Sequence, residues 1–194
     1  MNELEANRGT GAGGAKTNEN GLKFEKEISV EKILEEEGFT RTIFDKTTRT
    51  GFFLQKVVDG KRFIFLKQAG FKKYMKKTYG KDVLSNPDEA FVVTGEDKSV
   101  KVFVIEKKNQ NGSGSVDQKL WASVGIRFEY QYVLGDDIEV NYGLSLSSWF
   151  ENQFETRDRY KTLDIHLKQE KIPYFFANKE SYFDNLLRWV GINS

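Results

Sequence analysis

Apolar residues along the chain recur at two spacings, one typical of helices and one typical of strands. Helical spacing predicts helices over residues 22–37, 69–81, 159–171 and 180–190, and a capping box, Ser115 with Gln118 three residues later, begins a helix predicted over residues 115–134. Short runs rich in Val, Ile, Phe and Tyr predict strands over residues 39–45, 51–58, 61–66, 138–147 and 172–176. This alternation over 194 residues predicts an α/β fold, one domain with a mixed central sheet flanked by helices.

Three of the predicted helices have a definite apolar stripe. The stripes are Leu22, Ile28, Ile33 and Leu34 in the first helix, Phe71, Tyr74, Met75 and Thr78 in the second, and Leu120, Val124, Phe128 and Tyr132 in the helix over residues 115–134. The opposite face of the second helix carries four lysines, Lys72, Lys73, Lys76 and Lys77. These lysines form either a solvated face or a surface that contacts phosphate groups.

The clearest chemistry lies in residues 86–108, NPDEAFVVTGEDKSVKVFVIEKK, which have the pattern of a β-hairpin. Two apolar runs flank turn residues 94–99, so Asp88 and Glu106 are expected at neighbouring points of paired strands. Because side chains alternate along a strand, Glu106 and Lys108 would point to one face and Lys107 to the other. Two carboxylates beside an ammonium suit a hard divalent cation, whereas the simpler interpretation is an ordinary hairpin with solvent-exposed ends.

The composition narrows the chemistry further. The chain has no cysteine and a single histidine, His166, which excludes disulfides, thiolate nucleophiles, Cys/His zinc sites and most Ser-His-Asp arrangements. His166 lies in a polar segment and is expected to be structural. Any metal would therefore have oxygen ligands, as Mg²⁺ does. Lys plus Arg, 30, nearly equals Asp plus Glu, 29, so the net charge of +1 leaves nucleic-acid binding open.

Residues 1–20 are polar and rich in glycine. The string Gly9-x-Gly11-x-x-Gly14 matches the dinucleotide-binding pattern, but no strand precedes it, so nucleotide binding is not expected. The segment is interpreted as a flexible arm, or as an arm that lies along DNA through Arg8, Lys16, Asn18 and Asn20. The chain has neither a secretory signal pattern nor an apolar run long enough to span a bilayer, which predicts a cytoplasmic protein with no membrane partner.

The pair Pro87-Asp88 and the triplet Glu106-x-Lys108 resemble the motif of the PD-(D/E)xK nuclease superfamily. Three longer stretches look like those of type II restriction endonucleases: GAGGAKTNENGLKFE near the start, IEKKNQNGSGSVDQKL in the middle and KIPYFFANKESYFDNLLRWV near the end. The resemblance implies a single nuclease domain over residues 1–194. It would consist of a restriction-endonuclease-like core, residues 21–194, preceded by the arm of residues 1–20.

By this resemblance, Mg²⁺ would be held by Asp88, Glu106 and the backbone carbonyl of Lys107, and Glu25 from the first helix is the candidate for a glutamate that joins this metal site as a further catalytic residue. Lys108 would orient or deprotonate the attacking water, or stabilise negative charge. Contacts to DNA are expected from residues that follow the hairpin, namely Gln110, Ser113, Ser115 and Lys119. Base contacts are expected from the N-terminal arm, from residues 141–148, or from both, with the arm as the first candidate.

The function predicted from these residues is Mg²⁺-dependent, type II site-specific cleavage of double-stranded DNA by a homodimer. Cutting both strands of a palindrome favours two-fold symmetry. One alternative is a repair or structure-specific nuclease of the same fold, which would prefer mismatches, junctions or ends. Another is a non-catalytic DNA-binding protein, although Asp88, Glu106 and Lys108 are all present. The recognition sequence and the position and stagger of cleavage stay open.

Overall fold

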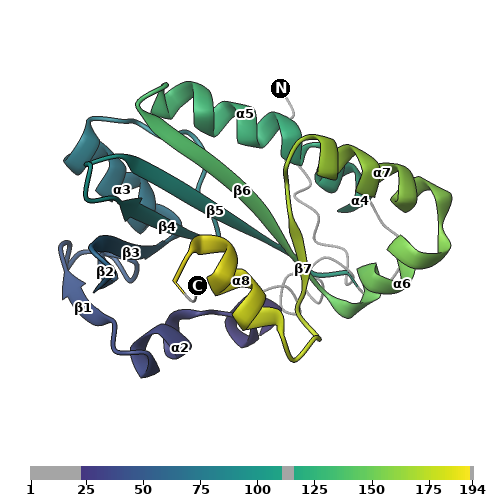
Figure 1. The fold of residues 1–194 in the computed structure, drawn as a ribbon, viewed down its shortest axis with the longest axis horizontal. Coiled ribbons are helices and arrows are strands. Elements are labelled where there is room, and N and C mark those ends of the chain that lie inside the picture. The colour runs from purple at the N-terminus through teal and green to yellow at the C-terminus, as the bar shows by residue number, and fades with distance from the viewer. Residues whose placement is uncertain (1–22, 111–115, 193–194) are drawn as a thin grey trace, which may run out of the picture.

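A seven-stranded sheet forms the centre of the computed structural model, which describes residues 23–110 and 116–192 (Figure 1). The strands follow one another across the sheet in chain order. Neighbours from β1 to β5 are antiparallel, and β6 and β7 run parallel to β5. The strands are β1 (Thr40–Ile43), β2 (Phe52–Val58), β3 (Lys61–Lys67), β4 (Glu89–Thr94), β5 (Val100–Lys108), β6 (Ile138–Leu146) and β7 (Tyr174–Phe176). The predicted α/β class, with a mixed central sheet flanked by helices, is confirmed.

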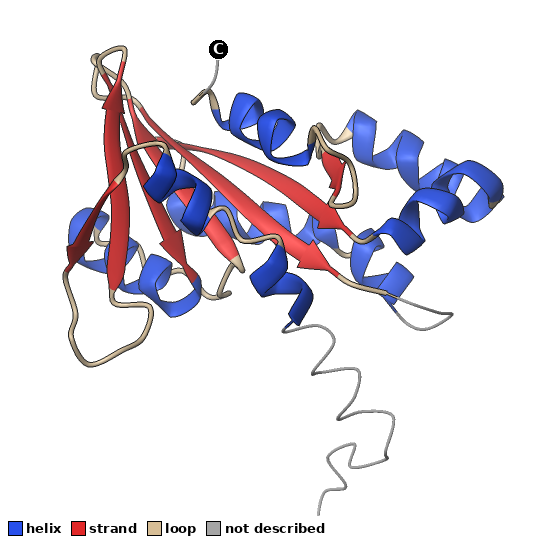
Figure 2. Cartoon of the chain, turned by 90° about the horizontal axis from the view of Figure 1, so that it is seen from below, coloured by secondary structure: helices blue, strands red, loops and turns tan. Residues whose placement is uncertain are grey.

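Helices cover both faces of this sheet, which Figure 2 shows from a second direction. Buried residues of α3, α5, α6 and α7 pack on one face, and those of α2 and α8 pack on the other. No helix in the described ranges is long and apolar enough to cross a membrane. The helices are α2 (Glu31–Glu36), α3 (Gln68–Tyr79), α4 (Val116–Trp121), α5 (Ser123–Leu134), α6 (Ser148–Thr156), α7 (Asp158–Gln169) and α8 (Tyr182–Val190), and residues 23–27 add a short helical segment.

Strand β5 shows why the sheet has a core on each side. Val102 and Val104 are buried in the core under α3 and α5, whereas Phe103 and Ile105 are buried in the core under α2 and α8. Successive side chains of a strand point to opposite faces, so a strand covered on both faces has a continuous apolar run in its sequence. Three polar residues, Glu106, Lys107 and Lys108, lie at the end of the strand, which places them at the rim of the sheet.

Two turns set the register of the antiparallel strands. Between β2 and β3, Asp59 and Gly60 have positive φ angles of 48° and 73°, as a tight two-residue turn between antiparallel strands requires. Between β4 and β5 the chain reverses over residues 95–99. Glu89 then pairs with Ile105, so the predicted hairpin is confirmed.

The single helix predicted over residues 22–37 is wrong, because the chain breaks near Ser29. Residues 23–27 form one helical segment, and α2 begins only at Glu31. The Ser29 hydroxyl donates a hydrogen bond to Glu89 Oε1 at 2.7 Å and accepts one from the Glu31 N–H at 3.4 Å. Serine competes in this way with helical hydrogen bonds. The predicted stripe is therefore divided between two segments, and its first member, Leu22, lies outside the described residues.

The stripe predicted for residues 115–134 is confirmed only in its first half, where Leu120 is buried and Val124 packs against the core. α4 and α5 cover this range on either side of Ala122, and Phe128 and Tyr132 are 70% and 79% exposed. Steps of four residues advance about 40° beyond one full turn of an α-helix, so a stripe built from them drifts off the buried face. Tyr130 and Leu134 are buried on α5 instead. The pattern also misses α6, which directly follows β6.

Gly70, in the first turn of α3, touches the loop between β1 and β2. A Cβ at position 70 would lie 2.0 Å from the Thr50 carbonyl oxygen, well inside van der Waals contact. We expect Gly70→Ala to lower the free energy of unfolding by about 1–3 kcal/mol, as overpacking does. In an unobstructed helix the same change would raise it by about 1 kcal/mol.

Urea denaturation measures this change. The matched control is Gly125→Ala in α5, where a Cβ would meet nothing within 4 Å. The control variant is expected to gain stability, and a gain at position 70 as well would contradict the close approach of Thr50.

Candidate active site

Asp88 and Glu106 lie beside each other where β4 begins and β5 ends. Asp88 immediately precedes β4, and the pairing of Glu89 with Ile105 brings it opposite Glu106. The backbone N–H of Lys107 donates a hydrogen bond to Asp88 Oδ2 at 2.7 Å, which fixes this carboxylate against β5. Burial raises the pKa of Glu106, and the neighbouring Asp88 carboxylate raises it further. Two carboxyl groups therefore lie side by side at a site that is partly shielded from solvent.

Lys108 lies on the same face of β5 as Glu106, as the alternation of a strand predicts. Its ammonium forms an ion pair with Glu106 Oε1, and the two side chains are only 18% and 21% exposed. The ammonium lowers the pKa of Glu106, but burial and Asp88 outweigh it. Asp88, Glu106 and Lys108 thus form one cluster at the rim of the sheet.

Glu25 approaches this cluster from the helical segment of residues 23–27. Burial raises the pKa of its carboxyl group, Asp88 raises it further, and Lys107 and Lys108 lower it. Glu25 and Asp88 also line the same pocket, and the Glu25 carbonyl oxygen accepts a hydrogen bond from Lys107 Nζ at 3.1 Å. The structure therefore brings together the four side chains predicted to be catalytic, Glu25, Asp88, Glu106 and Lys108.

The side chain of Lys107 points to the opposite face of the sheet, where it forms a buried ion pair with Glu89. Nζ of Lys107 lies 2.9 Å from Glu89 Oε1, and both side chains are almost fully buried. The same Nζ donates a hydrogen bond to the Glu25 carbonyl oxygen at 3.1 Å, and Ser29 donates one to Glu89. The pair thus holds the segment from Glu25 to Ser29 against the ends of β4 and β5.

Because the Lys107 side chain points away, Lys107 lies beside Asp88 through its backbone. The sequence predicts a metal ligand at this backbone, namely the Lys107 carbonyl. Sequence reasoning missed Glu89 and Ser29. An acidic residue within an otherwise apolar strand, as in EAFVVT, is the signal that points to Glu89. Ser29 has no comparable signal, because serine is common between helices.

Two buried tyrosines, Tyr130 of α5 and Tyr142 of β6, belong to the core on the face of the sheet from which Glu106 projects. Burial raises the pKa of both hydroxyls, and Glu106 raises each further. Tyr130 donates a hydrogen bond to the Ser85 carbonyl oxygen at 3.3 Å. The Tyr142 hydroxyl is buried and has no hydrogen-bond partner among the described residues. Neither tyrosine stands out in the sequence, because each occupies an ordinary apolar position.

The two carboxylates of the cluster fit a small divalent cation that takes few of its ligands from the protein. In the described parts of the chain, no three acidic, histidine or cysteine side chains form a group that could hold a metal. Mg²⁺ usually keeps several water ligands and takes one or two carboxylates from the protein. Asp88 and Glu106 supply two carboxylates, and a cation between them would relieve both the burial of charge and the repulsion from Asp88 that raise the pKa of Glu106.

Glu106 is expected to weaken the metal-free protein at neutral pH. Its pKa is raised above the ordinary value of 4.5, so the stability it contributes is present at acidic pH and is lost as the pH rises through the folded-state pKa. We expect Glu106→Gln, in EDTA, to unfold at a higher temperature than the wild type at neutral pH. The difference should shrink at acidic pH, where the wild-type carboxyl group is protonated. A neutral-pH midpoint at or below that of the wild type would contradict this expectation.

The predicted DNA-contacting residues are only partly described. The backbone N–H of Gln110 donates a hydrogen bond to Ser147 Oγ at 3.2 Å, and the Ser147 hydroxyl donates one to the Gln110 carbonyl at 3.1 Å, which ties the ends of β5 and β6 together. Lys119 is exposed on α4. The remaining predicted contacts lie outside the described residues, namely Arg8, Lys16, Asn18, Asn20, Ser113 and Ser115.

The lysines of α3 are mostly engaged within the protein. Lys72 donates a hydrogen bond to the Leu84 carbonyl, Lys73 forms an ion pair with Asp45, and Lys76 forms one with Asp82 at 2.8 Å. These contacts favour the interpretation of this face as a solvated surface. His166 stacks on Trp121 with ring centroids 5.5 Å apart, which agrees with a structural role.

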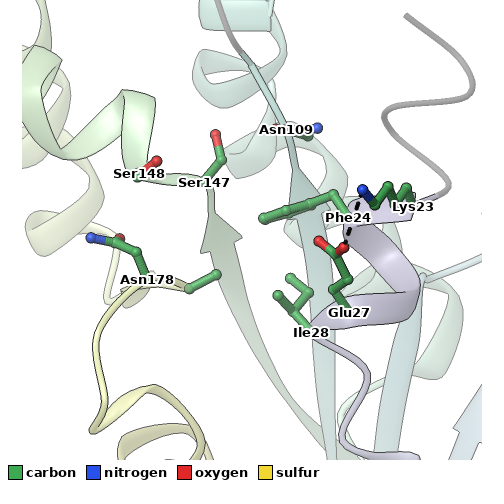
Figure 3. A pocket seen from close by; sticks show the side chains of 9 residues that line it. Lys23, Phe24, Glu27, Ile28, Asn109, Ser147, Ser148 and Asn178 are labelled. Carbon is green, nitrogen blue, oxygen red and sulfur yellow. Dashed lines mark ion pairs between the residues drawn. The ribbon is translucent and has the colours of Figure 1, made fainter. Parts of the chain in front are cut away.

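Two pockets flank the helical segment of residues 23–27. One, of about 470 Å³, lies at the ends of β5, β6 and β7, and its wall includes Phe24, Asn109, Ser148 and Asn178 (Figure 3). The other, of about 510 Å³, adjoins Asp88 and Glu25 and carries several basic side chains. The candidate catalytic cluster therefore borders the second pocket.

Comparison with known proteins adds little to this geometry. No family model matches the sequence, and no curated protein matches it. Among solved structures, the chain is similar to an XisH family protein from Nostoc punctiforme PCC 73102, with 12% sequence identity and a TM-score of 0.35 over 79% of this chain and 88% of that one. A likeness this weak assigns no activity, so a function for this chain has to be argued from the residues of the site.

Proposed function

We propose that this protein is a Mg²⁺-dependent nuclease that hydrolyses phosphodiester bonds in double-stranded DNA. One observation carries the proposal: Asp88, Glu106 and Lys108 converge at the adjoining ends of two hairpin strands, with Glu25 beside them. The order of elements around this hairpin also agrees with a restriction-endonuclease-like core, because helices and antiparallel strands precede it and α4, α5 and β6 follow it.

Phosphodiester hydrolysis needs an activated water, relief of charge on the phosphate and help for the departing oxygen. Mg²⁺ held by Asp88, Glu106 and the backbone carbonyl of Lys107 would supply Lewis-acid activation of the phosphate and of a bound water. Lys108 would orient the attacking water, or stabilise negative charge on the phosphate.

The finer form of the proposal is a type II restriction endonuclease that acts as a homodimer. It is supported by the resemblance of three sequence stretches to such enzymes, and by the symmetry that cutting both strands of a palindrome favours. A repair or structure-specific nuclease would use the same cluster on different DNA. A non-catalytic DNA-binding protein would not need two carboxylates and an ammonium gathered at one rim of the sheet.

Incubation with phage-length duplex DNA, once with Mg²⁺ and once with EDTA, tests the proposal. Discrete bands that need Mg²⁺ would establish site-specific cleavage, and sequencing of their ends would give the site and the stagger. A smear, or cleavage limited to junctions and mismatches, would favour the repair nuclease. Intact DNA in both reactions, with a mobility shift that shows binding, would contradict nuclease activity.

A further inference from the structure

The second pocket is lined by basic side chains that have no role in the proposed catalytic cluster. We call it the basic pocket, and its charged and aromatic lining includes Lys26, Arg41, Arg49, Phe52, Lys67 and Asp88. Its volume of about 510 Å³ lies within the roughly 300–1,000 Å³ range of ligand pockets. Asp88 lies in its wall, so a group bound in the pocket would lie next to the candidate cleavage site.

Two of its cations are fixed by protein contacts. The Arg41 guanidinium is bound by Glu31 and by Glu35, the latter at 2.8 Å, and lies 4.0 Å from the centroid of the Phe52 ring. Lys67 forms an ion pair with Glu31 at 3.1 Å. Glu31 is thus shared between two cations, so its negative charge is already compensated. These residues build a rigid wall with little net charge of its own.

Lys26 and Arg49 differ from these two cations. Both are exposed, and the side chain of neither forms a hydrogen bond or ion pair with another described residue. Lys26 follows the candidate catalytic residue Glu25 directly. The pocket therefore presents two uncompensated positive charges beside the catalytic cluster, whereas three lysines of α3 are already occupied.

Arg49 projects from a loop that is held in place. The Lys73 ammonium pairs with Asp45, and the N–H groups of Phe44 and Asp45 both donate to the Gly51 carbonyl, at 3.0 and 2.9 Å. At the other end of the loop, Gly70 allows the Thr50 carbonyl to approach α3. Because the loop is already held in place, binding of a ligand by Arg49 would cost little additional backbone entropy.

We propose that the basic pocket binds phosphodiester groups of the DNA strand that is cut, with Lys26 and Arg49 as the phosphate ligands. This inference rests on the proposed nuclease function and names a substrate-binding site for it. The planar guanidinium of Arg49 can hold two phosphate oxygens at once, and Lys26 contributes a point charge. The negative groups Glu25 and Asp88 border the same pocket, so phosphate would bind on the side of the two cations.

The test uses a fluorescein-labelled DNA duplex of arbitrary sequence, with binding followed by anisotropy in EDTA over a series of salt concentrations. We expect Lys26→Gln and Arg49→Gln each to bind about tenfold more weakly than the wild type. The slope of log affinity against log salt should fall in magnitude by about 0.9 for each variant and by about 1.8 for the double variant. Arg49→Lys keeps the charge and should retain most of the slope.

Two control variants distinguish the effect of this pocket on DNA binding from the effect of removing any positive charge. Lys161→Gln on α7 makes the same charge change far along the chain, and should leave the slope nearly unchanged. Lys77→Gln tests the rival basic face on α3. Far-ultraviolet circular dichroism and thermal unfolding confirm that each variant is folded.

The outcomes distinguish this inference from the proposed function. If Lys26→Gln and Arg49→Gln bind like Lys161→Gln, or if only Lys77→Gln weakens binding, the basic pocket is not the phosphate site. Cleavage of duplex DNA by the wild type with Mg²⁺ would then leave the nuclease proposal standing. A wild type that neither binds the duplex nor cuts it would overturn both.

Discussion

Replacing Lys107 by methionine is expected to lower the free energy of unfolding by about 3–5 kcal/mol, the cost of breaking a buried ion pair by removing one partner. The Glu89 side chain is 0% exposed, and its Oε2 atom already has no hydrogen-bond partner among the described residues. Without the ammonium, Glu89 keeps only the Ser29 hydroxyl as a partner among the described residues. Urea denaturation at neutral pH measures the loss.

The double variant Glu89→Gln with Lys107→Met separates the ion pair from the general effect of changing a core residue. Removing both charges leaves no buried ion, so the double variant should be clearly more stable than Lys107→Met alone. Equal stability of the two variants, or a loss below about 1 kcal/mol for the single one, would contradict a buried charged pair at this position.

Replacing Asp88 by asparagine is expected to slow DNA cleavage about 10³-fold or more, a loss typical of removing one group that stabilises charge in the transition state. Asparagine is nearly the same size as aspartate, and its side-chain oxygen can still accept the hydrogen bond from the Lys107 N–H. The change therefore removes a charge and a metal ligand with little disturbance of the strand. Binding of duplex DNA in EDTA should be retained.

Asp136→Asn is the matched control for this variant. Asp136 is exposed in the turn before β6, and its change should leave the cleavage rate within twofold or so of the wild type. A rate of cleavage by Asp88→Asn equal to that of the control would show that the cluster at the ends of β4 and β5 is not the active site.

The local sequence pattern was sufficient to predict those features of the site that depend on residues close together in the chain. The hairpin follows from two apolar runs around a turn, and the opposite directions of Lys107 and Lys108 follow from the alternation of a strand. The amphipathic helix α3 also follows from its spacing, because Phe71 and Met75 are buried one turn apart.

The features that the sequence did not predict depend on contacts between distant positions. Ser29 breaks the first helix because its hydroxyl meets Glu89, sixty positions away along the chain. The basic pocket joins Lys26 to Arg49 across two separate segments, and no spacing in the sequence connects them. Local periodicity also fails within α5, where Phe128 is exposed although it continues an apparent stripe.

The most direct test of the central claim is the initial rate of nicking of supercoiled plasmid by the wild type and by Glu106→Gln, purified in parallel, each with Mg²⁺ and with EDTA. We expect nicking by the wild type only when Mg²⁺ is present, and a rate for Glu106→Gln that is lower by about 10³-fold. Glu139→Gln, an exposed glutamate of the same sheet, should behave as the wild type. Equal nicking by the wild type and Glu106→Gln, or no nicking by the wild type with Mg²⁺, would contradict the claim.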